Sequence, residues 1–177
     1  CIAILMLSVF GGCLSGGKPR DLAVIRDFEL EPYLGTWYEI ARLDHRFERG
    51  LDHCRAEYSL REDGRVRVLN RGRQTATGVW KTAEGVARLS GAPGEGSLRV
   101  SFFGPFYGGY NILAWRRETP SYALVCGNTR EYFWILSRDP HLPPEMLDAI
   151  LPQLGEWGFA TNCLIWVRQD NPAARAL

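Results

Sequence analysis

The sequence predicts an all-β fold, either a closed antiparallel barrel or a sandwich. Aromatic residues make up 12% of the chain, and 19 of its 177 residues are glycine, a composition typical of sheet proteins with many tight turns. Many short segments are rich in aromatic and β-branched residues and alternate between apolar and polar positions. Turn signals separate these segments at regular intervals, Asp63-Gly64 being the strongest. A chain of this length can form one domain with a core or a cavity.

The strands follow from this alternation in chain order. Because successive side chains point to opposite faces of a strand, Leu98 and Phe102 share the inward face of theirs. The expected strands are 35–41, 55–60, 65–70, 79–81, 86–89, 98–102, 123–127 and 131–138.

One helix is expected, near the C-terminus. Two prolines at 143–144 fit its first turn, and Pro152 is expected to kink it or end it early. Its apolar side chains recur at helical spacing, at Leu147, Ile150, Leu151 and Leu154.

The strand at 131–138 has an unusual face, on which three apolar side chains are followed by Arg138. A guanidinium at the end of an apolar row needs a partner, and an indole ring is a good one. Trp37, in the first strand, is the candidate.

These residues carry a resemblance to the lipocalin family. The run 35–38, Gly-Thr-Trp-Tyr, resembles the first-strand motif of that family, and Ser137-Arg138 its last-strand arginine. The runs 100–111, 123–127 and 132–138 resemble the outer-membrane lipocalins of bacteria, with apolipoprotein D a more distant relative. The resemblance covers 22–168. It implies an eight-stranded up-and-down antiparallel barrel with one C-terminal α-helix packed outside. It also implies structural roles for Gly35, Trp37 and Arg138, the arginine packing on the tryptophan at the closed end.

The first twelve residues are apolar and uncharged but too short to span a bilayer, which takes about 20 apolar residues. They are interpreted as the remnant of a signal peptide. The run 11–13, Gly-Gly-Cys, resembles the lipobox of bacterial lipoproteins, which implies acylation of Cys13. Residues 13–20 would then be a lipidated tether and 21–177 the lipocalin domain. Because Leu14 is not the aspartate associated with inner-membrane retention, the expected location is the bacterial outer membrane.

The other cysteines would lie in an oxidising compartment, where a disulfide is allowed. The family resemblance implies a disulfide between Cys54 and Cys163. Cys126 is expected to be a small, buried and inert thiol.

Composition and motifs argue against several functions. The net charge is +1 and the chain has no basic run, so it lacks the positive electrostatic potential that attracts nucleic acid. The three histidines are not at metal-ligand spacing, and neither a nucleophile elbow nor a phosphate-binding loop occurs. No enzymatic activity, cofactor or metal is therefore predicted.

The resemblance instead implies a ligand inside the barrel. An apolar lining prefers a hydrocarbon chain, so the expected ligand is a fatty acid or a lysophospholipid. Carried over strand by strand, the inward ligand-binding residues are Val66, Val68, Asn70, Ala87, Val100, Phe102, Tyr110, Ile112, Val125, Tyr132 and Trp134.

The polar loop 44–53 is expected to arch over the barrel mouth. Its residues His45, Arg46 and Arg49 are candidates for binding an acidic head group, although a solvated loop explains them as well. The aromatic residues of 103–107 are expected to form a lip or a partner surface.

Alternatives stay open. The same apolar residues could be a packed core, in which case the chain would be a non-binding structural or interaction module of the envelope. An enzyme on a lipocalin fold is the third reading. A homodimer formed through the outer face fits any of these.

Overall fold

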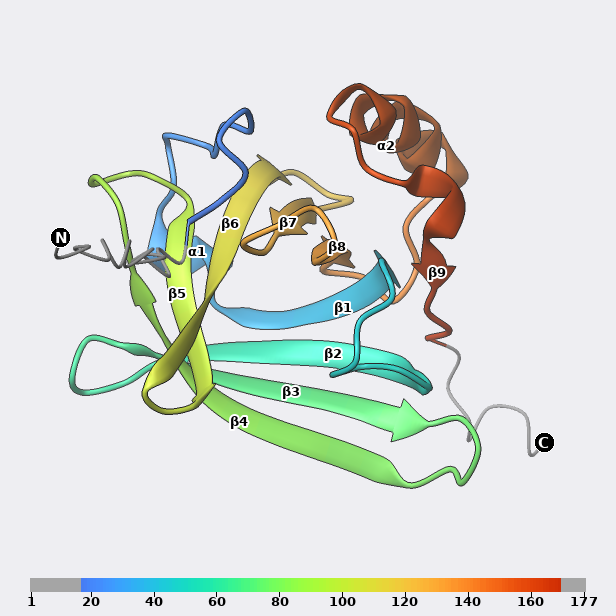
Figure 1. The fold of residues 1–177 in the computed structure, drawn as a ribbon, viewed down its shortest axis with the longest axis horizontal. Helices are drawn as coiled ribbons and strands as arrows, with labels where there is room; N and C mark the ends of the chain where they lie inside the picture. The colour runs from blue at the N-terminus through green and yellow to red at the C-terminus, as the bar shows by residue number, and fades with distance from the viewer. Residues whose placement is uncertain (1–16, 170–177) are drawn as a thin grey trace, which may run out of the picture.

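The computed structural model describes residues 17–169. The expected signal peptide and the acylation site at Cys13 lie outside the described residues. The described chain forms an antiparallel sheet in the order β2-β3-β4-β5-β6-β7-β8-β1, and pairing of β1 with β2 closes it into a barrel (Figure 1). The strands are β1 (Gly35–Arg42), β2 (Leu51–Leu60), β3 (Val66–Gln74), β4 (Trp80–Leu89), β5 (Ser97–Phe103), β6 (Phe106–Arg116), β7 (Tyr122–Cys126) and β8 (Phe133–Ser137).

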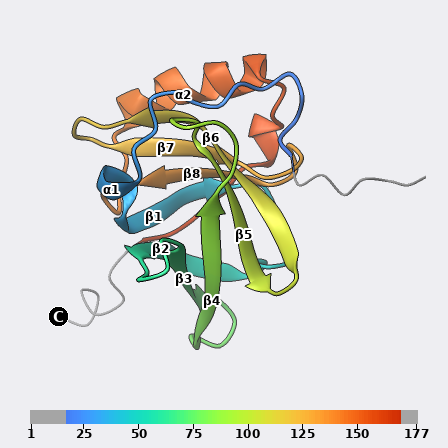
Figure 2. The same ribbon diagram turned by 90° about the vertical axis from the view of Figure 1, so that its left-hand side faces the viewer.

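The expected eight-stranded barrel with an outer helix is therefore confirmed. Helix α2 (Pro144–Glu156) lies against the outside of the barrel (Figure 2). A 3-10 turn, η1 (Thr161–Cys163), leads from it to a ninth short strand, β9 (Ile165–Trp166), which pairs with β1.

Two apolar clusters stabilise this arrangement, one inside the barrel and one between the barrel and α2. The second contains Ile150 and Leu154, two residues of the expected helical stripe. The helix does not end early at Pro152 but continues to Glu156. Since Leu154 is fully buried just after the proline, packing onto the barrel compensates for the missing backbone donor.

The first strand contains an irregularity that matters for the barrel interior. Its pairing with β8 shifts register between Glu39 and Ala41, as at a β-bulge. Ile40 and Ala41, consecutive in sequence, both join the cluster under α2. The alternation resumes out of phase, and Arg42 and Glu39 meet in a buried hydrogen bond.

The closed end agrees with the sequence-based expectation. The guanidinium carbon of Arg138 lies 3.9 Å from the centroid of the Trp37 ring. Helix α1 (Leu30–Tyr33) precedes β1, and its Tyr33 is buried against Trp37, with ring centroids 4.9 Å apart. Gly35 has φ +94°, a conformation that favours glycine, and a Cβ there would contact Arg138.

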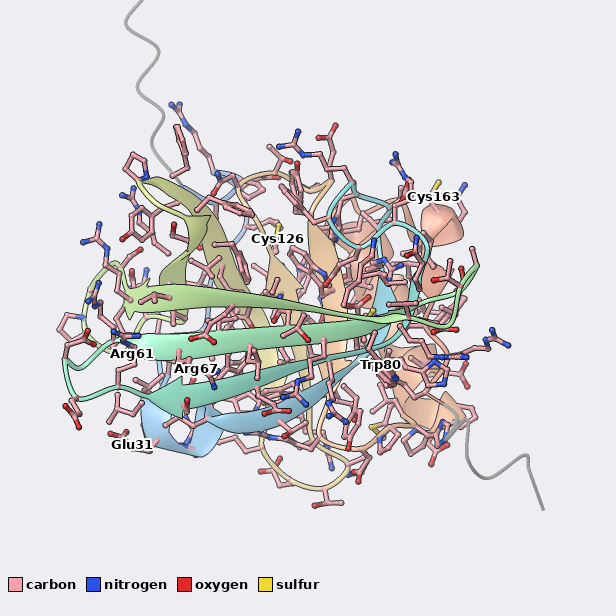
Figure 3. The ribbon with its side chains drawn as sticks, turned by 90° about the horizontal axis from the view of Figure 1, so that it is seen from below. Glu31, Arg61, Arg67, Trp80, Cys126 and Cys163 are labelled. Atoms are coloured by element: carbon pink, nitrogen blue, oxygen red, sulfur yellow. The ribbon has the colours of Figure 1, made fainter. Side chains whose placement is uncertain are left out.

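The expected disulfide is not formed, because Cys54 and Cys163 are both free thiols. The Cys54 sulfur is buried 3.9 Å from the Arg42 guanidinium, whereas Cys163 lies in η1 and is exposed (Figure 3). The two sulfurs instead lie near other partners, Cys54 at the Asp52 carbonyl and Cys163 at the Asn162 side chain. Cys126 is buried under α2 as expected, and burial raises the pKa of its thiol to about 11.

Candidate ligand-binding site

A cavity of about 110 Å³ lies inside the barrel. Eight of the eleven residues expected to face a ligand line it, namely Val66, Val68, Asn70, Ala87, Val100, Phe102, Tyr110 and Trp134. These come from β3, β4, β5, β6 and β8, so most of the barrel wall contributes. The part of the wall that these eight residues form is mainly apolar, with one amide, one phenol hydroxyl and one indole. Contact of these residues with a ligand stays a prediction.

Three expected lining residues lie elsewhere. Ile112 and Val125 pair across β6 and β7, have no exposed surface and pack into the cluster inside the barrel. They are core residues, because neighbouring side chains fill the space in front of them. Tyr132 precedes β8 and lies beside His45, with ring centroids 5.6 Å apart, rather than lining the cavity.

Three tyrosines form one wall of the cavity. The hydroxyl groups of Tyr33 and Tyr110 are 2.7 Å apart, and Tyr58 donates to Tyr110 over 3.1 Å. All three line the cavity, and burial raises their pKa values far above the usual range. They are therefore neutral hydrogen-bonding groups, and because they bond to one another they leave the cavity few free donors.

Another part of the wall carries buried charge. Arg42, which is 1% exposed, donates to a Glu39 carboxylate oxygen over 2.6 Å. It also donates to the backbone carbonyls of Glu48 and Leu51, over 2.8 and 3.0 Å. Glu39 and Glu48 both line the cavity. The arginine thus connects β1 to the β1–β2 loop and to the start of β2.

The two carboxyl groups differ in pKa. Burial, reinforced by the charge of Glu48, raises the pKa of Glu39 to about 8. Burial also opposes the ionised form of Glu48, but hydrogen bonds from His45 and Trp134 outweigh it and hold the Glu48 pKa below its usual value. The Trp134 indole donates to Glu48 over 2.9 Å. At neutral pH the cavity therefore presents one ionised carboxylate.

The three expected head-group residues do not line the cavity. His45 is buried, and its Nε2 lies 3.0 Å from the Glu48 carboxylate. Arg49 pairs with Asp44 over 2.6 Å on the surface, and Arg46 lies over the Phe47 ring. The three expected bases therefore do not face the cavity; Glu39, Glu48 and Arg55 are the acidic and basic residues of β1, the β1–β2 loop and β2 that line it.

The residues that sequence reasoning missed divide into two groups. Ala56 and Tyr58 alternate on β2 and face Asn70 and Val68 in register, so the period of the strand could have identified them. Glu39 shares the inward phase of Trp37, but no local pattern pairs it with Arg42, because the bulge in β1 brings them together.

The remaining features do not suggest another kind of site. Within residues 17–169, no group of three His, Cys, Asp or Glu side chains is placed to hold a metal ion. None of the described helices is both long and apolar enough to cross a membrane.

Known proteins resemble this chain in sequence and fold. Residues 28–169 match a family model described as a lipocalin-like domain. The outer membrane lipoprotein Blc of Citrobacter freundii is 51% identical over 159 residues, covering 90% of this chain and 89% of that protein. Apolipoprotein D of Rattus norvegicus is 37% identical, covering 82% of this chain and 79% of that protein.

Solved structures agree on the fold. Insecticyanin from the tobacco hornworm Manduca sexta superposes with a TM-score of 0.70 at 23% identity, covering 89% of each chain. The eight-stranded closed barrel with its outer helix, the arginine stacked on the first-strand tryptophan and the family match lead to one conclusion: this chain belongs to the lipocalin family.

Proposed function

We propose that this lipocalin binds the acyl chain of one lipid inside its barrel and serves lipid storage or transport in the cell envelope. The observation that carries the proposal is the apolar cavity, lined by residues of most strands of the barrel. Burial of a methylene group contributes about 0.8 kcal/mol, so even part of an acyl chain would gain several kcal/mol there. No bond is made or broken, and binding is reversible partition.

The acidic cavity wall favours a lysophospholipid over a free fatty acid. Glu48 lines the cavity and its lowered pKa keeps it ionised, so it would repel a fatty-acid carboxylate and attract the ammonium of an ethanolamine head group. Ligand pockets usually measure about 300–1,000 Å³, which exceeds the cavity volume. Binding therefore requires side chains or the 43–50 loop to move outward.

The location is proposed from the relatives. Three matching proteins, from Citrobacter freundii, Escherichia coli and Vibrio cholerae, are named outer membrane lipoproteins, at 49–51% identity. We infer the same location for this chain, with an acyl anchor on Cys13 and the barrel joined to it by a short tether.

Lipid extraction followed by mass spectrometry, and titration with lysophosphatidylethanolamine and palmitate under tryptophan fluorescence, would test the proposal. Trp134 is a natural reporter because it lines the cavity and bonds Glu48. We expect saturable binding with one site and at least about tenfold tighter binding of the lysophospholipid, the difference that about 1.4 kcal/mol produces.

Two variants separate the acyl site from the head-group site. Val100→Phe narrows the cavity and should weaken both ligands, whereas Val79→Phe, on an exposed turn, should weaken neither. Glu48→Gln should reduce the preference for the lysophospholipid. Glu84→Gln is its control: Glu84 is exposed and paired with Arg67, so its loss should leave the preference unchanged. A protein that carries no lipid and ignores both ligands would be a packed structural module instead.

A further inference from the structure

The hairpin that joins β5 and β6 exposes apolar side chains that neither core nor cavity uses. Phe103 and Phe106 are each 77% exposed, and they are register partners across the turn. Directly paired residues project from the same face of a hairpin. Every residue of 103–108 is exposed, so the two rings form an apolar tip at the end of the hairpin. The hairpin itself is the connection between β5 and β6 in Figure 1. An exposed aromatic cluster of this kind marks a contact surface.

Two arginines beside this tip have no acidic partner. Arg88 of β4 and Arg99 of β5 lie directly opposite each other, an arrangement that destabilises a sheet unless something neutralises the charges. Neither forms an ion pair within residues 17–169, whereas the neighbouring Arg65 and Arg67 pair with Asp63 and Glu84. The Arg88 guanidinium lies 5.0 Å from the ring centroid of Tyr107, which connects this charge to the hairpin.

The tether reaches the same hairpin. The carbonyl oxygen of Gly17 would lie 3.2 Å from a Cβ placed on Gly109, two residues beyond Tyr107 in β6. Four residues span at most about 14 Å, so an acyl anchor on Cys13 would hold this side of the barrel close to the bilayer. This step rests on the acylation proposed above, while the aromatic and cationic surface does not.

We propose that the β5–β6 hairpin is a membrane-docking tip for an anionic phospholipid surface. Phe103 and Phe106 enter the interface between head groups and acyl chains, and Arg88 and Arg99 contact lipid phosphates. Strand alternation adds a consequence. Phe102 lines the cavity while Phe103 faces outward, so docking brings the wall of the lipid site next to the membrane.

Vesicle flotation with the full chain carrying Cys13→Ser, which removes the acyl anchor, tests the proposal. The vesicles contain either roughly three parts phosphatidylethanolamine to one part phosphatidylglycerol, or phosphatidylcholine alone. We expect binding to the anionic vesicles, weakened by salt, and at least about tenfold weaker binding to the neutral ones. The double variant Phe103→Ser/Phe106→Ser and the double variant Arg88→Gln/Arg99→Gln should each lose about tenfold in affinity.

Matched controls remove similar groups elsewhere. Leu60→Ser/Val79→Ser deletes exposed apolar side chains at the end of β2 and before β4, and Arg65→Gln/Arg67→Gln deletes arginines that already have acidic partners. Both should bind vesicles like the parent chain. All variants should titrate with lysophosphatidylethanolamine unchanged, so that failure of docking is distinguishable from failure of the cavity to bind lipid.

Three results would overturn the docking tip: no vesicle binding by the parent chain, equal binding to both vesicle types, or unchanged binding by the phenylalanine variant. Sedimentation velocity tests the remaining alternative, which is that the hairpin mediates a dimer. If Phe103→Ser/Phe106→Ser converts a dimer into a monomer and the parent chain ignores vesicles, the hairpin is a contact between two copies of this chain.

Discussion

The two ends of the barrel each hold an arginine, half-buried Arg138 at one and fully buried Arg42 at the other, and they satisfy its donors in different ways. At the closed end Arg138 stacks on Trp37 and donates to the backbone carbonyls of Thr36, Pro32 and Leu34, each over 2.8 Å. At the cavity wall Arg42 donates to a Glu39 carboxyl oxygen, to the Glu48 carbonyl in the loop and to the Leu51 carbonyl at the start of β2. Burial lowers the pKa of Arg138, which has no carboxylate partner in the described chain to oppose that effect.

This difference makes the stability of one end independent of pH and that of the other end dependent on it. Backbone carbonyls and an indole ring do not titrate, so the closed end keeps its contacts over the whole physiological pH range. Arg42 and the carboxyl groups of Glu39 and Glu48 lie together at the other end. The surroundings raise the pKa of Glu39 and lower the pKa of Glu48. The stability of this group of three side chains, and the position of the 43–50 loop that Arg42 holds, should therefore vary with pH.

The largest effect is expected from removing the guanidinium at the acidic wall. Arg42→Met leaves the Glu39 carboxyl group and the backbone carbonyls of Glu48 and Leu51 without their donor and should reduce the free energy of unfolding by at least about 3 kcal/mol. Urea unfolding at neutral pH measures this. Arg49→Met, whose ion pair with Asp44 is on the surface, should change stability by at most about 1 kcal/mol. Equal losses in the two variants would contradict the buried role of Arg42.

At the closed end Arg138→Lys tests whether geometry or charge matters. Lysine keeps the charge but lacks the planar fork that reaches three carbonyls while lying on the Trp37 ring. We expect a loss of about 2–3 kcal/mol in urea unfolding. The loss should be the same at every pH tested. A variant as stable as the parent would show that a point charge suffices there.

Glu39→Gln sharpens the contrast in pH dependence. A carboxyl group whose pKa is raised by folding contributes stability that is complete below its unfolded pKa and is lost as pH rises to about 8. From this group the parent chain should lose up to about 1.4 kcal/mol per pH unit between about pH 4.5 and 8.

The glutamine variant cannot ionise and should lack this slope. Urea unfolding at successive pH values across that window is the measurement. Glu84→Gln is the control, because the lowered pKa of Glu84 makes its contribution to stability constant above about pH 4.5 and dependent on pH only below that value. Parallel pH profiles for the parent chain and Glu39→Gln would rule out the assigned role of Glu39.

The smallest effect is expected in the tyrosine wall. Tyr110→Phe removes one hydroxyl that bonds to both Tyr33 and Tyr58 while leaving the ring in place. The expected loss is about 1–2 kcal/mol by thermal unfolding, because two buried hydroxyls each lose a partner. Tyr107→Phe, whose hydroxyl belongs to an exposed residue, should be neutral. A stabilised Tyr110→Phe variant would mean that burying the Tyr110 hydroxyl destabilises the fold by more than its hydrogen bonds stabilise it.

Sequence reasoning was most successful at the closed end of the barrel. Trp37 and Arg138 lie in strands whose alternation was clear, and a cation at the end of an apolar row demands an aromatic or acidic partner. The same alternation placed eight of the expected residues on the cavity wall. It also placed Ile112 and Val125 inside the barrel, but facing inward does not determine whether a neighbouring side chain has already filled the space in front of a residue.

By itself, then, the sequence determined most of the strands, the outer helix and the apolar interior, which follow from local periodicity and a few motifs; it divided β4 in two and did not predict β6. Only the tertiary structure decided that Cys54 and Cys163 stay unbonded, that Arg42 turns toward Glu39, and that Glu48 and Arg55 line the cavity in place of the expected loop bases. The physical reason is that a bulge shifts the phase of a strand, and charges buried together set one another's pKa, which no reading of single residues along the chain contains.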